Sequence, residues 1–224
     1  METMPMSKVW LRVRLEAARL FSDSSGIAAT EFAVIVPLML VLFFGTVEFS
    51  SGVAVDRKVT LTARTLSDLT SQAPSSVPNA VWAGVDDNYL QNVFTASIAI
   101  VKPYSVVPTT AQISEIYVDS SRNAKIQWSR AATIGSDTAT QATLAASTHN
   151  PGDPITTVPA QLLVAQTYLI LSEVSYLYTP LGIGYVMKSN VTLSDVSYSR
   201  PRQVTCVIYN NLPNPVPTPC PTTQ

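Results

Sequence analysis

Residue types that metal binding and most catalysis depend on are scarce in this chain. The 224 residues include one histidine, His149, and two cysteines, Cys206 and Cys220. A His/Cys metal site with three or four ligands cannot be assembled from that stock without carboxylates. We therefore expect no metal, no cofactor and no enzymatic activity.

Charge is also scarce. Lys, Arg, Asp and Glu make up 13% of the chain, about half of the usual quarter, and the formal net charge is -1. Without a basic surplus the chain has no general attraction for nucleic acid, which we exclude as a partner. The low glycine count of 8 and the absence of an internal repeat exclude a collagen-like or solenoid protein, while 46% apolar residues exclude wholesale disorder.

One long segment carries almost no charge. Sixteen residues from Phe32 to Val47 have no charged side chain, and with their flanks they extend to the 23 residues 27–49. Helical residues rise about 1.5 Å each, so this segment spans roughly 34 Å, enough to cross a bilayer core of about 30 Å. A buried helix of a soluble domain is the alternative, but such a helix keeps a polar stripe, which is missing here. The pattern predicts a transmembrane helix at residues 27–49.

The flanks of this helix predict its orientation. More basic residues precede the helix than follow it, so the positive-inside rule places the N-terminus in the cytoplasm and residues 74–224 across the membrane. Disulfides persist in that compartment. Cys206 and Cys220 have 13 residues between them and are a candidate disulfide; two unpaired thiols are the alternative. The basic residues in front are Lys8, Arg12, Arg14 and Arg19, and those behind are Arg57 and Lys58.

A carboxylate, Glu31, stands near the start of the apolar segment. A carboxylate near mid-membrane costs about 2.5–3.5 kcal/mol on insertion scales, so such a residue usually has a partner. Hydration at the cytoplasmic interface is the other explanation. Gly26 lies five residues before Glu31, and Phe32 follows it. A Gly, four non-acidic residues and Glu-Phe at the mouth of an apolar helix resemble the processing site of type IV pilins and pseudopilins.

This resemblance assigns roles to four residues. It implies that a membrane prepilin peptidase cuts after Gly26, that the mature chain begins at Ile27, and that residues 1–26 form a basic leader. Cutting creates an ammonium group at the edge of the apolar helix, and Glu31 of a neighbouring subunit can pair with it. The pair costs less in the bilayer than two separate charges and selects a subunit register. Glu31 and Phe32 are thus expected to serve assembly.

The wider pattern is similar to the TadE/TadG-like family of tight-adherence (Flp) pilus proteins. The family's Glu-Phe-Ala start, Pro, aliphatic run, Gly and second Glu match Glu31, Pro37, Gly45 and Glu48. Residues 169–180 resemble its Glu-Val-Ser-Tyr…Thr-Pro segment, and the Pro-Arg ending at residues 199–202 resembles its closing part. The TadE-like type fits better than longer TadG-like members, and the TadF type stays open. The resemblance implies four partners: other pilin or pseudopilin subunits, the inner-membrane pilus platform, a prepilin peptidase and membrane lipid.

The long helix has two further features, a proline inside its membrane segment and an amphipathic part after that segment. Pro37 removes one backbone hydrogen bond and usually bends a helix; it is either a tolerated kink or a loosening that lets the helix leave the bilayer or fit a bundle. Beyond the membrane, a one-sided stripe predicts an amphipathic extension over residues 50–73, ended by Pro74. We interpret the stripe as packing on the protein's own sheet, with a partner helix as the alternative. Its residues are Val55, Val59, Thr62, Leu66, Leu69 and Ala73.

Residues 74–211 predict an α+β head with a small antiparallel sheet, similar to pilins and pseudopilins. We expect strands that alternate buried and exposed positions, as Ala124, Ile126 and Trp128 do with their neighbours. Residues 212–224 contain five prolines and predict an extended tail unless Cys220 tethers it. The fold of residues 131–158 stays open. The expected elements are a helix at 88–101 capped by Asp86 or Asp87, strands at 113–118 and 124–129, a loop at 133–153, a short helix at 159–166, and strands at 168–178, 189–198 and 203–209.

Other candidate residues have simpler explanations than catalysis. His149 lies in a loop context and is interpreted as solvated. The pair Asp86-Asp87 is better explained as a helix cap than as a catalytic carboxylate pair. Arg200 and Arg202 are interpreted as anchors of the last strand turn.

Three functions stay open from the sequence. The first is a processed minor pilin or pseudopilin of the bacterial inner membrane, with its head in the periplasm. The second is an unprocessed single-pass envelope anchor whose periplasmic head binds a partner. The third is a secreted protein cut after Gly52-Val53-Ala54, although its apolar run is slightly too long for a signal peptide. We predict the first, because two ordered blocks of the chain carry the resemblance.

Overall fold

The structure is a computed structural model that describes residues 14, 18, 19, 25–75, 81–180, 190–210 and 220. Most of the predicted leader (1–26) and of the predicted tail (212–224) lies outside the described residues. The chain divides into two compact units, Met1–Phe49 and Ser50–Gln224.

The helix α2 (Ser25–Ser71) contains all of the predicted membrane segment and its extension. Its last turn ends where the sequence predicts. The amide of Gln72 donates to the carbonyls of Asp68 and Leu69, both at 3.2 Å, and Pro74 follows. Proline cannot continue the hydrogen-bonding pattern of a helix, which explains the stop. The prediction of one long helix to about residue 72 is therefore confirmed.

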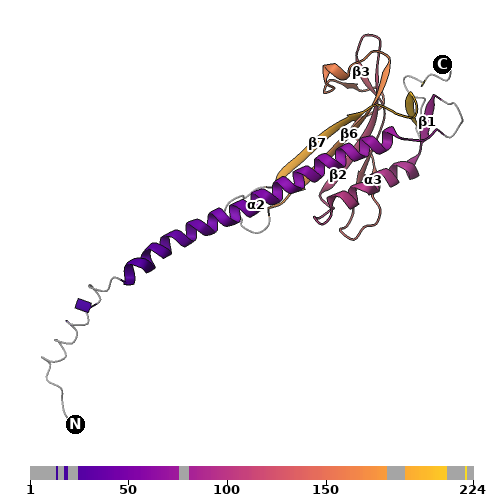
Figure 1. The fold of residues 1–224 in the computed structure, drawn as a ribbon. Helices are drawn as coiled ribbons and strands as arrows, with labels where there is room; N and C mark the ends of the chain where they lie inside the picture. Colours follow the sequence, from indigo (N-terminus) through magenta and orange to yellow (C-terminus); the bar gives the residue numbers. More distant parts are fainter. Residues whose placement is uncertain are drawn as a thin grey trace. The chain divides into compact units, whose positions relative to one another are not determined.

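The second unit is built on an antiparallel sheet of order β4-β3-β2-β6-β7, with the short strand β5 also paired to β3 (Figure 1). Together with the helices, this sheet confirms the predicted α+β fold. The hairpin β2–β3 turns at Arg122, whose φ of 64° lies in the left-handed region, and the Asp119 side chain accepts from the Asn123 amide at 2.8 Å. The bounds are β2 (Thr109–Val118), β3 (Ala124–Thr133), β4 (Thr143–Ala145), β5 (Pro154–Ile155), β6 (Thr167–Tyr178) and β7 (Val191–Ser199).

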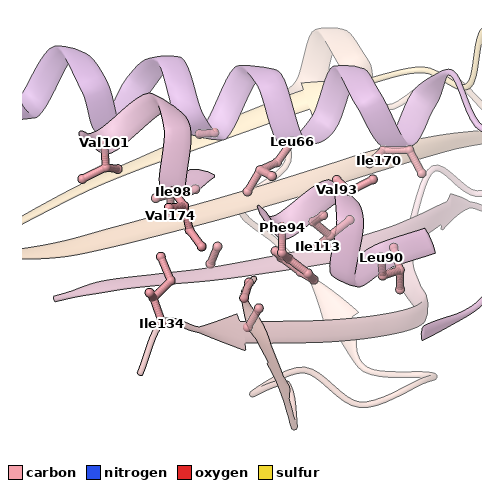
Figure 2. Close-up of a cluster of buried hydrophobic side chains, with 14 of the residues drawn as sticks. Leu66, Leu90, Val93, Phe94, Ile98, Val101, Ile113, Ile134, Ile170 and Val174 are labelled. Carbon is pink, nitrogen blue, oxygen red and sulfur yellow. The ribbon is translucent and has the colours of Figure 1, made fainter. Parts of the chain in front are cut away.

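Two helical segments cover one face of this sheet. The helix α3 (Asp87–Val101) starts at Asp86, whose side chain accepts from the Tyr89 amide at 2.8 Å, so the predicted cap is confirmed. Figure 2 shows Leu66 of α2 and Phe94 of α3 in one apolar cluster with Ile113 and Val174 of the sheet. The stripe of the α2 extension thus packs on the protein's own sheet, as predicted. Its members Val55, Val59, Thr62, Leu66 and Ala73 are buried, and Leu69 packs against the cluster.

A second, parallel strand pair lies beside the main sheet. The strand β1 (Trp82–Val85) pairs with β8 (Cys206–Tyr209). A Cβ added at Gly84 would lie 2.6 Å from the end of the Asn210 side chain, so a larger residue at this position would require that side chain to move. The sequence does not predict β1, because four residues that include Ala and Gly give no strand signal.

Three other expectations are corrected. The segment 133–153 is not one loop, because β3 continues to Thr133 and β4 lies within it; the small Thr, Leu and Ala residues of β4 hid that strand. The helix expected at 159–166 is one 3-10 turn, Ala160–Leu162. The alternation expected in β3 fails at Gln127, which is fully buried between Ile126 and Trp128. Glu115 pairs with Trp128 and the next residue, Ile116, pairs with Ile126, so Gln127 is an extra residue of β3, and this bulge explains the failure.

Candidate functional site

The predicted cleavage position, Gly26, lies in the first turn of α2 and has no packing role. A Cβ added there meets no heavy atom within 4 Å. A helical glycine costs about 0.5–1 kcal/mol relative to alanine, so glycine is normally kept in a helix for a reason. The packing of this chain supplies no such reason at Gly26.

The predicted assembly residues follow on the same helix. Ile27 and Phe32 are 61% and 69% exposed, and Glu31 is exposed as well. Ile27 and Glu31 are four positions apart and therefore lie on the same side of α2. Among the described residues, no ion pair involves Glu31. The structure thus presents these three side chains outward, available to another molecule.

The surface of α2 up to Phe49 is apolar and open. An 18-residue window of this helix has a mean hydropathy of 2.4, and none of the window is buried. The hydroxyls along it are satisfied within the helix, since Thr30 donates to the Ile27 carbonyl and Thr46 to the Leu42 carbonyl, both at 2.8 Å. An exposed apolar helix with satisfied polar groups suits lipid or other apolar helices and disagrees with a core helix of a soluble domain. Among the described residues, α2 is the one helix long and apolar enough to cross a membrane.

Pro37 lies inside α2, and the helix continues on both sides of it. Because proline has no amide hydrogen, the carbonyl of Ala33 loses its intrahelical donor. Gly45, one of the residues that carried the family resemblance, meets nothing within 4 Å of an added Cβ. Small residues let membrane helices approach closely, so Gly45 leaves room on α2 for a neighbouring helix.

The two cysteines are close together in the second unit. The Cα atoms of Cys206 and Cys220 lie 6.1 Å apart, within the range that disulfides span. Both side chains are buried with Tyr168, and Trp82, Tyr117 and Ile208 pack against them. This placement holds residue 220 of the predicted tail beside β8.

A buried side-chain clamp holds β8 against the main sheet. The amide of Val207 donates to Glu115 Oε1 at 2.5 Å, and its carbonyl accepts from Trp128 Nε1 at 2.6 Å. Glu115 and Trp128 are direct cross-strand neighbours on β2 and β3, so together they bind the amide and the carbonyl of one residue of β8. Burial raises the pKa of Glu115 to about 8, while its hydrogen bonds with Val207 and Trp128 act in the opposite direction.

A second set of contacts ties β8 to α3. Arg130 Nη2 lies 2.8 Å from Asp87 Oδ1, and the Tyr209 hydroxyl donates to the same oxygen. The Arg130 guanidinium lies 5.6 Å from the centre of the Tyr209 ring. The ring centres of Trp128 and Tyr209 are 5.8 Å apart. Asp87 is therefore a structural anchor and not half of a catalytic carboxylate pair.

The face of the main sheet that the helices α2 and α3 do not cover holds an open cavity of about 550 Å³. His149 lies at this cavity and is not solvated as predicted, because its Nε2 is 2.8 Å from Glu173 Oε2 and its side chain is 28% exposed. Gln112 Nε2 donates to the same Glu173 oxygen at 2.8 Å. These long-range contacts could not be inferred from a loop context. Among the described residues, no group of three or more His, Cys, Asp or Glu side chains could hold a metal ion.

Arg202 anchors the segment after β7 to α2. Its Nη2 lies 2.5 Å from Asp68 Oδ1, and its amide donates to the Ser71 carbonyl at 2.8 Å. The interpretation of Arg202 as an anchor therefore agrees with the structure, although the contact is with a helix and not with a strand turn.

Comparison with known proteins adds one match. Residues 26–66 match the family model described as TadE-like protein. This chain carries a TadE-like segment. The match begins at the predicted cleavage residue and includes Glu31, Pro37 and Gly45. No curated protein and no solved structure matches the chain.

Proposed function

We propose that this TadE-like chain is a minor pilin or pseudopilin that a prepilin peptidase cuts after Gly26 for assembly of a tight-adherence pilus. Residues 27–49 hold it in the bacterial inner membrane as a single span, with the leader in the cytoplasm and the head, residues 74–211, in the periplasm. Its partners are the peptidase, membrane lipid, sibling subunits and the inner-membrane platform.

One observation carries this proposal. Gly26 stands at the start of an open apolar helix, where neither packing nor backbone conformation calls for glycine. A requirement imposed by another molecule, such as a peptidase that must fit its substrate backbone closely, accounts for it. The TadE-like match starting at the same residue agrees with that explanation.

Cutting after Gly26 changes the electrostatics of the helix start. The new ammonium group of Ile27 and the carboxylate of Glu31 are both costly in the apolar part of a bilayer, at about 2.5–3.5 kcal/mol for a charge at the helix centre. When Glu31 of one subunit meets the ammonium of a neighbour, both charges are compensated. The pair therefore favours one axial register between subunits.

The proposed disulfide Cys206–Cys220 adds stability to the head in an oxidising compartment. It closes a loop from β8 to residue 220, beside the clamp that Glu115 and Trp128 form on Val207. The head is thereby fixed near its C-terminal end, which suits a part that must withstand assembly outside the cytoplasm.

Replacing Glu31 by Gln tests the assembly role. We expect Glu31→Gln to be inserted and cut normally, because neither step needs the pairing, but to produce no fibres when surface pili are counted by electron microscopy. Glu48→Gln is the matched control, since it removes a carboxylate from the other end of the same segment. Normal fibres in the Glu31→Gln strain would contradict the proposed pairing.

A further inference from the structure

The strand β7 forms a long edge of the main sheet. It pairs with β6 over nine residues, from Val191 opposite Tyr178 to Ser199 opposite Ile170. In the described part of the chain, no strand pairs with its other side. The opposite side of the sheet ends in β4 and β5, of three and two residues, so β7 is the long edge.

Two hydrogen bonds show which backbone groups of β7 face outward. The Leu177 amide donates to the Pro108 carbonyl at 3.2 Å, so odd-numbered residues of β6 bond toward β2 and even-numbered ones bond toward β7. The register then directs the odd-numbered residues of β7 inward. In agreement, the Val196 amide donates to its neighbour Asp195 Oδ1 at 2.8 Å and not to β6. The outward residues are Thr192, Ser194, Val196 and Tyr198.

This edge has few of the features that prevent strand addition. Proteins usually protect an edge with proline, with charged side chains, lysine above all, or with a bulge. The sequence of β7 contains no proline and no lysine, and its pairing with β6 shows no register shift. Its one charged residue is Asp195, at the centre of the nine.

The position of Asp195 argues against pairing of β7 with a second copy of itself. Two antiparallel β7 strands in full overlap, bonded through their even-numbered residues, place Asp195 directly opposite Asp195. That position is a non-hydrogen-bonded pair, in which side chains lie closest, and like charges there are destabilising. A strand with lysine or arginine at that position gains an attractive pair in place of the repulsion.

We propose that β7 accepts an added antiparallel strand from a different protein, and that this strand carries a basic residue opposite Asp195. The outward carbonyls and the outward amides of Thr192, Ser194 and Tyr198 provide the backbone hydrogen bonds, while the Val196 amide already has Asp195 as its acceptor. The charge pair provides the selection. The inference does not rest on the proposed function, because it concerns the head alone and is independent of cleavage at Gly26.

A designed peptide provides the test. The probe has nine residues, alternates threonine and valine, carries lysine at its centre and bears a fluorophore; a second probe has glutamate in place of the lysine. Binding to the full chain in detergent micelles is measured by fluorescence polarisation. We expect the lysine probe to bind roughly tenfold more tightly than the glutamate probe, since a swapped cross-strand charge changes attraction into repulsion.

Variants of the chain sharpen the test. Asp195→Lys should reverse the preference between the two probes. Ser194→Pro removes one outward amide while the bonds to β6 remain, so the lysine probe should lose binding with the unfolding midpoint of the head unchanged. Ser194→Ala is the matched control, because it removes the hydroxyl and keeps the amide. Equal affinity for the two probes, failure of both to bind, or unaltered binding to Ser194→Pro would each overturn the proposal.

Discussion

The buried carboxyl of Glu115 should make the stability of the head depend on pH. Its side chain is 2% exposed, and burial raises its pKa from the ordinary value of 4.5 to about 8. In the unfolded chain the same group is ionised above about pH 4.5. Between these two values the folded head holds a proton that the unfolded chain releases.

The sign and size of the effect follow from this difference in bound protons. The folded state binds more protons, so the stability that Glu115 contributes is fully present below about pH 4.5 and is lost as the pH rises through about 8. A difference of one bound proton between the folded and unfolded states changes the free energy of unfolding by about 1.4 kcal/mol per pH unit. From about pH 5.5 to 7.5, the free energy of unfolding of the head should therefore fall by roughly 2 kcal/mol on account of this residue.

Glu115→Gln isolates this contribution. Glutamine keeps an acceptor for the Val207 amide and cannot ionise, so the fall in stability between the two pH values should shrink by about 2 kcal/mol relative to the wild type. Denaturant unfolding of the full chain in detergent, followed by tryptophan fluorescence to which the buried Trp128 contributes, provides the measurement. Asp56→Asn, which removes an exposed carboxyl from α2, should leave the pH dependence unchanged. The same pH dependence in Glu115→Gln and the wild type would refute this reasoning.

Two further outcomes are expected. Phe94→Ala should lower the free energy of unfolding of the head by about 3–5 kcal/mol, because Phe94 is fully buried, whereas Phe32→Ala, on exposed helix surface, should leave it unchanged; equal denaturation midpoints would contradict the packing described here. Cys206→Ser should cost about 3 kcal/mol through loss of the loop closure. Without reductant, mass spectrometry of the denatured wild type after alkylation should show no modified thiol, and two labelled cysteines would disprove the bridge to Cys220.

Elements with strong periodic patterns were predictable from the sequence. The stripe from Val55 to Ala73 and the capped helix after Asp86 depend on spacing within one helix, which the sequence displays directly. The strands β6 and β7 were also predicted, to within two residues at each end, because their apolar residues cluster between turn signals.

Features that depend on contacts between distant residues were not predictable. The clamp joins Glu115 to Val207 across 92 positions, and a glutamate within a strand looks like a surface residue until its partner is known. The register shift at Glu115 also turned Gln127 inward against the simple alternation. His149 similarly is only partly exposed because it contacts Glu173, 24 positions away.

The candidate functional residues also differ in how far the sequence alone predicts them. Gly26, Glu31 and Pro37 could be proposed from the sequence because their spacing along one helix is itself the signal, and the TadE-like match covers the same residues. The edge of β7 was not found, since only the order of strands in the sheet shows which strand lies outermost.

The state of the N-terminus tests the central claim most directly. The protein should be extracted from membranes of cells that have an active prepilin peptidase, and its first residues should be determined by sequencing together with intact mass. We predict a chain that begins at Ile27 and lacks residues 1–26. A chain that keeps Met1 in cells whose fibres form normally would contradict the account.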